Sequence, residues 1–162
     1  MVEQIEGVQR RATKQIPRMK ELSYAERLRK LKLPTLSYRR IRGDMIETYK
    51  ILTGIYDKDA CGFLKLWKDM APRTGTRGHP FKLYPQQART SLRKNSFALR
   101  VVDVWNSLPS YVVTSKTVNT FKNRLDKYWS DQDLLYDDFK AKITQTRSDA
   151  LYLETESDEE AP

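Results

Sequence analysis

Apolar residues recur at helical spacing along most of this chain, and proline or glycine ends most of these runs. The clearest run occupies residues 95–108, and its apolar members are Phe97, Val101, Val104, Trp105 and Leu108. The predicted helix starts at Asn95 or Ser96, and Pro109 ends it. Because the apolar side chains share one face, that face has to pack against other elements. Core packing is therefore favoured for the two aromatic residues, while base stacking beside the neighbouring arginines stays open.

Two further amphipathic helices are expected nearer the N-terminus. The first carries an inward stripe at steps of three and four and ends before Pro17. That stripe consists of Ile5, Val8, Ala12 and Ile16, and the opposite face carries Arg10, Arg11 and Lys14. Ser23 followed by Glu26 is a capping box, so a short second helix begins there with Leu28 and Leu31 inward.

A longer helix begins at Thr35 or Ser37 and ends at Gly54, where a left-handed residue is wanted. Its inward stripe consists of Ile41, Met45, Tyr49 and Leu52. Gly43 inside this helix predicts a close contact with another helix. A last helix begins at Ser115 or Thr117 and turns Val118, Phe121, Leu125 and Tyr128 or Trp129 to one face. The fold class predicted is mainly α, with about five helices in a small bundle.

The middle of the chain is less regular. Residues 57–70 fit one or two helical turns, and residues 71–80 are a loop bounded by proline and glycine. Residues 81–84 and 88–92 fit two short strands on either side of Pro85. A short β-hairpin at 81–92 is therefore a further expectation.

Charge divides the chain unevenly. Residues 1–130 carry 27 Lys and Arg against 11 Asp and Glu, whereas residues 131–162 carry 3 against 10. Such an imbalance is typical of a body that faces nucleic acid and has an acidic tail, although solubility alone is the simpler explanation. We expect a basic helical domain at 1–130, an acidic extension at 131–147 for which a continued helix is one option, and a disordered acidic tail at 148–162.

Composition argues against several functional classes. A single cysteine, Cys61, and a single histidine, His79, exclude an internal disulfide framework and a Cys/His zinc site. No apolar run has the length of a membrane span or of a secretory signal. The expectation is an intracellular protein of the nucleus or cytoplasm, with no membrane partner, no metal and no cofactor. His79 is expected on a solvent-facing turn.

Enzyme motifs are also missing from the sequence. There is no nucleophile elbow, no metalloprotease motif and no phosphate-binding Walker loop. The densest carboxylate cluster consists of Asp131, Asp133, Asp137 and Asp138, at the edge of the acidic extension. A two-metal site needs carboxylates on rigid elements. We therefore expect no enzymatic activity and no small-molecule substrate.

The sequence feature that points to a binding function is clustered Lys and Arg with few Asp or Glu among them. Residues 10–42 hold twelve Lys and Arg against Glu21 and Glu26, a pattern that suits a phosphate backbone and departs from the mixed charge of ordinary surfaces. The loop 73–79 combines two arginines with two glycines, and residues 89–100 add a basic segment. The expected nucleic-acid-binding residues are Arg10, Arg11, Lys14, Arg39, Arg40, Arg42, Arg73, Arg77, Arg89, Arg93, Lys94 and Arg100. The alternative for residues 10–42 is a solvated helix surface, and the alternative for the loop 73–79 is a flexible connector.

Six stretches in order resemble one family. They are residues 8–14, 22–28, 33–40, 42–50, 120–129 and the stretch Arg100-Val-Val-Asp-Val-Trp-Asn-Ser-Leu-Pro109. Together they resemble the region that follows the reverse transcriptase domain in LINE-type (non-LTR) retrotransposons of the jockey and chicken-repeat kind. The resemblance runs from about residue 3 to about residue 147. The metal-binding box of the polymerase and the cysteine-rich knuckle of some LINE clades are both missing from this sequence.

The resemblance implies a non-catalytic C-terminal segment of a retrotransposon polyprotein. Its implied partners are RNA or DNA, gripped as template or target during target-primed reverse transcription. The alternatives are a packing module that docks on the thumb of the upstream polymerase, or a decayed fragment without independent function. The acidic residues 149–160 are either a solubilising extension or a segment that folds back and competes with nucleic acid.

Overall fold

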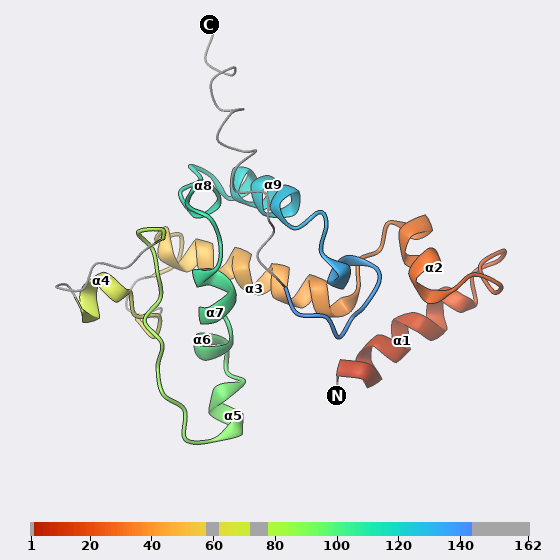
Figure 1. Ribbon diagram of the computed structural model, residues 1–162, viewed down its shortest axis with the longest axis horizontal. Helices are drawn as coiled ribbons and strands as arrows, with labels where there is room; N and C mark the ends of the chain where they lie inside the picture. The colour runs from red at the N-terminus through yellow and green to blue at the C-terminus, as the bar shows by residue number, and fades with distance from the viewer. Residues whose placement is uncertain (1, 58–61, 72–77, 144–162) are drawn as a thin grey trace, which may run out of the picture.

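The computed structural model describes residues 2–57, 62–71 and 78–143, and it is mainly α-helical (Figure 1). Its elements are α1 (Val2–Lys14), α2 (Tyr24–Leu31), α3 (Leu36–Leu52), α4 (Trp67–Met70), α5 (Ser91–Lys94), α6 (Phe97–Arg100), α7 (Val102–Asn106), α8 (Ser110–Val113), α9 (Val118–Tyr128) and the 3₁₀ turn η1 (Asp133–Leu135). The predicted fold class is confirmed. The predicted tail at 148–162 and the loop arginines Arg73 and Arg77 lie outside the described residues.

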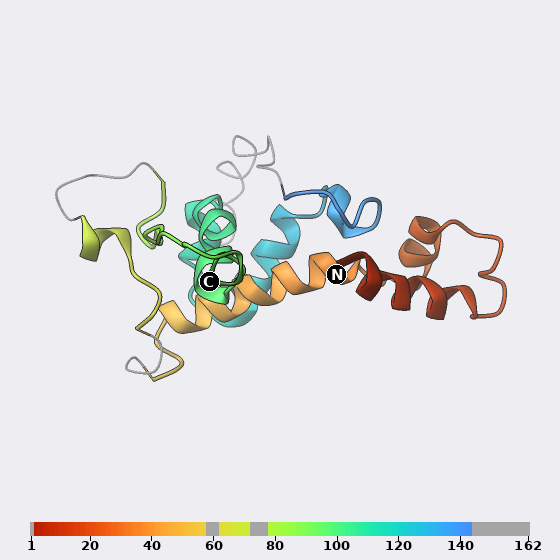
Figure 2. The ribbon, with the colours of Figure 1, turned by 90° about the horizontal axis from the view of Figure 1, so that it is seen from below.

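Helix α3 is the axis of the molecule. It contacts α1, α7, α9 and η1, so elements from both ends of the chain meet along it. In Figures 1 and 2 the pair α1 and α2 extends from one end of α3 as an arm, while α7 and α9 pack along the rest of its length. We call residues 2–34, which form this pair and its turns, the arm.

An aromatic cluster holds α3, α7 and α9 together. The ring of Tyr49 on α3 stacks on Phe121 of α9 with centroids 4.4 Å apart, and Trp105 of α7 lies 6.0 Å from Phe121. Trp129, at the end of α9, meets Tyr38 edge to face. Trp105, Phe121 and Trp129 are at most 1% exposed, which makes Trp105 a core residue as its spacing predicts.

Local signals in the sequence fix most helix ends correctly. Ser23 and Glu26 form the predicted capping box, and the Thr35 and Thr117 hydroxyls cap α3 and α9. Gly54 takes a left-handed conformation with φ of 74°, and the next amide bonds back to the carbonyl of Lys50 at 3.0 Å. The predicted helix at 95–108 begins after Ser96 but is divided into α6 and α7 at Val101.

The predicted hairpin at 81–92 does not form. Leu83 makes an isolated antiparallel bridge with Leu66 instead, and its own amide and carbonyl pair with the side-chain amide of Asn106 at 2.8 and 2.9 Å. Thr90 meanwhile caps α5, which places residues 91–94 in a helix. The backbone of Leu83 is therefore satisfied by partners distant in sequence, whereas residues 91–94 form local helical bonds.

Helix α1 packs with a different face from the one predicted. Its buried residues are Glu6 and Thr13, whereas Ile5 and Val8 are 52% and 57% exposed. Ile16, just past the helix, is 37% exposed. The face with Glu6 and Thr13 is turned inward, because these side chains hydrogen-bond to residues of α2 and to the start of α3.

We call residues 35–130 the body and residues 131–143 the strap. The strap follows the surface of the body, and its turn η1 contacts α3. Leu134 is 1% exposed, and Leu134 and Leu135 accept hydrogen bonds from the hydroxyl and amide of Thr35 at 2.6 and 3.0 Å. Asp137 pairs with Arg29 of the arm. Within this segment the only helical element is the short turn η1, so the extended helix considered for 131–147 does not form in its described part.

His79 is buried, which corrects the expectation of a solvent-facing turn residue. It is 2% exposed, and its Nε2 lies 3.1 Å from the carbonyl oxygen of Trp105. Burial lowers the pKa of the imidazole, and the nearby Lys82 lowers it further, while the hydrogen bond to Trp105 opposes both. The neutral ring therefore belongs to the folded state.

Glycines at two positions give opposite expectations for stability. A Cβ on Gly43, within α3, would have no heavy atom within 4 Å, so the predicted close contact is absent. We expect Gly43→Ala to raise the free energy of unfolding by about 1 kcal/mol through helix propensity. Gly78 has φ of 112°, so Gly78→Ala should lower it through backbone strain. Urea unfolding of both variants measures the pair, and a destabilised Gly43→Ala would contradict the expectation.

The burial of His79 predicts a pH-dependent stability. Its folded pKa is depressed, so the unfolded chain takes up the proton first, and stability falls as pH drops below the ordinary value of about 6.5. The slope reaches at most about 1.4 kcal/mol per pH unit for one proton. The chain has a single histidine, so His79→Gln should remove most of the pH dependence of the free energy of unfolding between about pH 7.5 and 5.5, as measured by urea unfolding. An unchanged slope in that variant would assign the effect elsewhere.

Candidate nucleic-acid interface

The position of the arm depends on one buried carboxylate. Glu6 of α1 is fully buried and accepts hydrogen bonds from the Tyr24 hydroxyl at 2.6 Å and from the Leu36 amide at 3.0 and 3.3 Å. Gln9 adds a bond to the carbonyl of Pro34 at 3.1 Å. Burial and the bond to Glu6 both raise the pKa of Tyr24, which keeps its proton on the hydroxyl. The arm is thus fixed to the first turn of α3 by satisfied polar groups.

Two arginines of the arm serve this packing. Arg27 is 5% exposed and donates to the Thr13 hydroxyl at 3.2 Å and to the Leu22 carbonyl at 2.5 Å. The guanidinium of Arg10 lies 5.3 Å from the ring centres of both Tyr24 and Phe139. Arg10, predicted to bind nucleic acid, therefore joins the arm to the strap by cation–π contact.

Arg42 and Arg100 are held by carboxylates of the body. The guanidinium of Arg42 makes two bonds to Asp126 at 2.5 and 2.7 Å, which join α3 to α9. Arg100 makes two bonds to Asp44 at 2.9 and 2.8 Å and joins α6 to α3. Hydrogen bonding to these carboxylates raises the pKa of both arginines. Their first role in the structure is to hold helices together.

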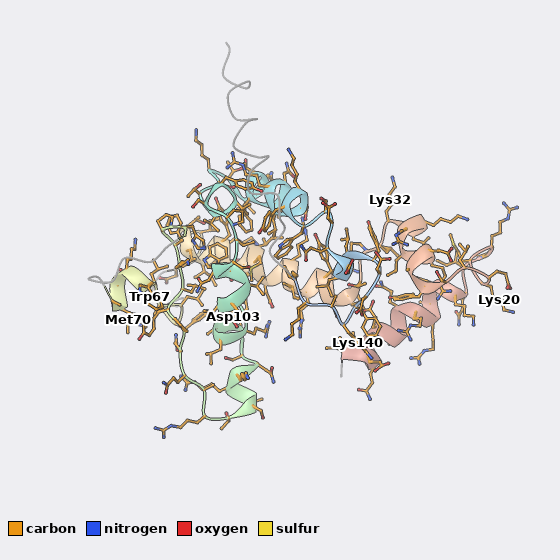
Figure 3. All side chains as sticks on the ribbon, viewed as in Figure 1. Lys20, Lys32, Trp67, Met70, Asp103 and Lys140 are labelled. Atoms are coloured by element: carbon orange, nitrogen blue, oxygen red, sulfur yellow. The ribbon has the colours of Figure 1, made fainter. Side chains whose placement is uncertain are left out.

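Four cations converge at the far end of the arm. A groove of about 610 Å³ lies where α1 ends and the chain turns toward α2. It is lined by Arg11, Lys14, Gln15, Ile16, Pro17, Arg18 and Lys20, with no carboxylate among them. The labelled Lys20 lies at this end of the molecule in Figure 3, whereas Lys32 lies at the end of α2 that leads to α3. We call this hollow the arm groove.

The turn that forms the arm groove holds one residue in an unfavourable conformation. Arg18 has φ of 64°, in the left-handed region that glycine or asparagine normally occupies. Such a conformation costs roughly 1–2 kcal/mol for a residue with a Cβ. Amides of the same turn bond to preceding carbonyls, among them Met19 to Ile16 at 3.1 Å, and Met19 itself is buried. The buried methionine anchors the turn while Arg18 stays exposed beside it.

The other predicted cations do not join the arm groove. Arg39 lines a hollow beside the Arg42–Asp126 pair, and Arg40 lines a separate groove against α1 and the strap. Arg89, Arg93 and Lys94 are exposed on and before α5, which lies away from the arm in Figure 1. Of the predicted positions that the structure describes, only Arg11 and Lys14 line the arm groove, and the structure adds Arg18 and Lys20 there. Pro17 in the sequence signals the turn that unites these four.

In residues 2–57, 62–71 and 78–143 there is no group of three His, Cys, Asp or Glu side chains placed to hold a metal ion. Within the same ranges no helix is both long enough and apolar enough to cross a membrane. The strap aspartates instead make structural contacts, such as Asp137 with Arg29 and Asp138 with the amide of Lys140 at 2.8 Å.

Comparison of the chain with protein-family models, curated proteins and solved structures gives no match. The retrotransposon resemblance therefore rests on the six sequence stretches and stays a prediction.

The two bidentate pairs predict a separation of stability from binding. Arg42→Gln or Arg100→Gln should lower the free energy of unfolding by about 1 kcal/mol each, because each leaves a carboxylate that anchors two helices without its partner. Each change should reduce RNA affinity only as much as the removal of one charge outside the contact surface would. Thermal unfolding and fluorescence anisotropy with a labelled RNA measure the two effects. A large affinity loss at full stability would return these arginines to the interface.

Proposed function

We propose that this chain binds RNA or single-stranded DNA without catalysis, and that the arm groove is its principal contact surface. The observation that carries the proposal is the convergence of Arg11, Lys14, Arg18 and Lys20 on one hollow without a carboxylate. Each cation that neutralises a phosphate releases condensed counterions, which makes such a surface bind polyanions with little regard to sequence.

The distribution of acids supports this choice of surface. Residues 10–32 hold nine Lys and Arg against two Glu, and one of those, Glu26, is occupied in capping α2. Elsewhere, Asp44, Asp126 and Glu47 are paired with Arg100, Arg42 and Lys50, which reduces the local positive charge. Positive charge is therefore denser within residues 10–32 than in residues 33–130.

The resemblance to LINE-type elements fits this function and extends the proposal. In that setting the chain is the segment after the polymerase, and it grips template RNA or target DNA during target-primed reverse transcription. The packing alternative also has an observation in its favour, since Val2, Ile5 and Val8 are 42%, 52% and 57% exposed on one face of α1. The charge on the arm favours nucleic acid as the first function.

Salt dependence tests the proposal quantitatively. For single strands the slope of log affinity against log salt is about −0.7 per phosphate neutralised. Replacing Arg11, Lys14 and Lys20 by Gln together with Arg18→Gly should therefore reduce the magnitude of the slope by about 3. Arg18→Gly alone should weaken binding while it relieves the left-handed strain, so its stability is kept or raised. Anisotropy titrations with a labelled single-stranded RNA, paired with urea unfolding, give both readouts.

Matched variants locate the surface. Replacing Arg89, Arg93 and Lys94 by Gln tests the α5 segment, and replacing the exposed Lys65, Lys68 and Lys116 by Gln tests general charge. Both triple variants should retain most of the slope. Equal losses in all variants would show diffuse electrostatics and reject the arm groove. A flat slope in the unchanged chain, with concentration-dependent sedimentation, would reject nucleic-acid binding in favour of packing.

A further inference from the structure

A second groove lies at the other end of α1. It consists of a hollow of about 620 Å³ between α3, α7 and the strap, and an adjoining hollow of about 60 Å³ under the first turns of α1. The two hollows share Val2, Ser37 and Arg40, so they form one continuous surface. We call it the strap groove. Figure 3 shows two of its lining residues, Asp103 on α7 and Lys140 on the strap near α1.

The strap groove is apolar along its length, and its lining holds four cations against two carboxylates. Its apolar lining consists of Val2, Ile5, Leu36, Ile41, Val104, Leu134, Phe139, Ala141 and Ile143. Its cationic lining consists of Arg40, Arg100, Lys140 and Lys142, of which Arg100 is held by Asp44 and Lys140 lies 3.3 Å from Glu3. Asp103 and the buried Glu6 are the carboxylates that line it. An occupant of complementary chemistry has apolar side chains flanked by acids.

One buried polar group in the strap groove has no protein partner. Ser37 is 9% exposed and lines both hollows, and its hydroxyl makes no hydrogen bond within the described residues. A buried hydroxyl left without a partner costs about 1–3 kcal/mol. Because the oxygen itself is buried, a ligand oxygen would reach it only where the lining side chains move aside.

The chain itself carries the complementary segment. Ile143 lines the groove and is the last described residue, and the sequence continues from it to residue 162. Within that continuation Leu151, Tyr152 and Leu153 form an apolar triplet, and its acidic neighbours are Asp149, Glu154, Glu156, Asp158, Glu159 and Glu160. Leu151 lies eight positions beyond Ile143, and an extended chain over eight positions spans about 26 Å. The triplet is therefore tethered within reach of the groove that Ile143 lines.

We propose that residues 149–160 of this chain dock in the strap groove, with Leu151 and Leu153 on its apolar lining and the following carboxylates facing Arg40 and Lys142. The site is distinct from the arm groove. Helix α1 has 13 residues and so separates the two by about 20 Å. Docking on the strap groove therefore leaves the arm groove open, and it holds whether or not the chain binds nucleic acid.

Paramagnetic relaxation in the full chain tests this docking. The single cysteine is removed by Cys61→Ser, and a spin label is attached through Thr155→Cys. We expect the amide signals of Ser37, Ile41 and Val104 to be lost, since these residues lie far from the label in sequence but line the groove. Signals at Lys20 and on α5 should be retained. Adding Leu151→Ser and Leu153→Ser should restore the groove signals without disturbing the folded body.

Further variants separate the rival occupants. Lys142→Glu should release the segment, whereas Lys116→Glu, outside the groove lining, should not. Loss of signal around Lys20 in place of Ile41 would show attraction to the arm groove and overturn the proposal. Retention of all groove signals would also overturn it. Mixing spin-labelled chains with isotope-labelled chains that carry no label should leave the groove signals intact, and their loss there would assign the groove to the tail of a second copy.

Discussion

The first turn of α3 is where the arm, the body and the strap are joined, and the Glu6 carboxylate is central to it. Glu6 accepts from the Leu36 amide, while Thr35 beside it caps α3 and donates to Leu134 of the strap at 2.6 Å. Backbone amides at a helix start lack intrahelical partners, so acceptors placed there satisfy groups that would otherwise be unpaired. The same few atoms thus cap the start of α3 and hold the arm and the strap against it.

The outward position of the apolar stripe on α1 follows from this junction. Turning Ile5 and Val8 inward would turn Glu6 and Gln9 away from Tyr24, Pro34 and Leu36. Periodicity in the sequence shows which residues share a face of a helix, but it does not show which face is buried. The partners of Glu6 are 18 and 30 residues away, and no local pattern announces them. Caps such as Ser23 and Thr117 could be predicted because their partners lie three residues along the chain.

The same limit explains which parts of the candidate site were predictable. Clustering of cations on the arm is visible in the sequence, and Pro17 indicates a turn among them. The roles of Arg42 and Arg100 are not, because their carboxylate partners are 84 and 56 residues distant. The hairpin prediction was wrong for a similar reason, since the Asn106 side chain that pairs with Leu83 lies 23 residues away. Long-range polar contacts therefore decide which cations are structural and which remain exposed.

Features that cost stability lie beside both ends of α1, and each end is next to one of the two proposed surfaces. At its C-terminal end Arg18 keeps a left-handed backbone that glycine would adopt at lower cost. At its N-terminal end Val2 and Ile5 stay in contact with water and the Ser37 hydroxyl stays unpaired. Local rules of stability are usually broken where a protein binds something, because the partner supplies the missing interactions. A polyanion at Arg18 would gain from a cation held outward, and an acidic apolar segment at Val2 would cover the exposed side chains. Glu6, between these ends, holds the helix in the one orientation that presents both.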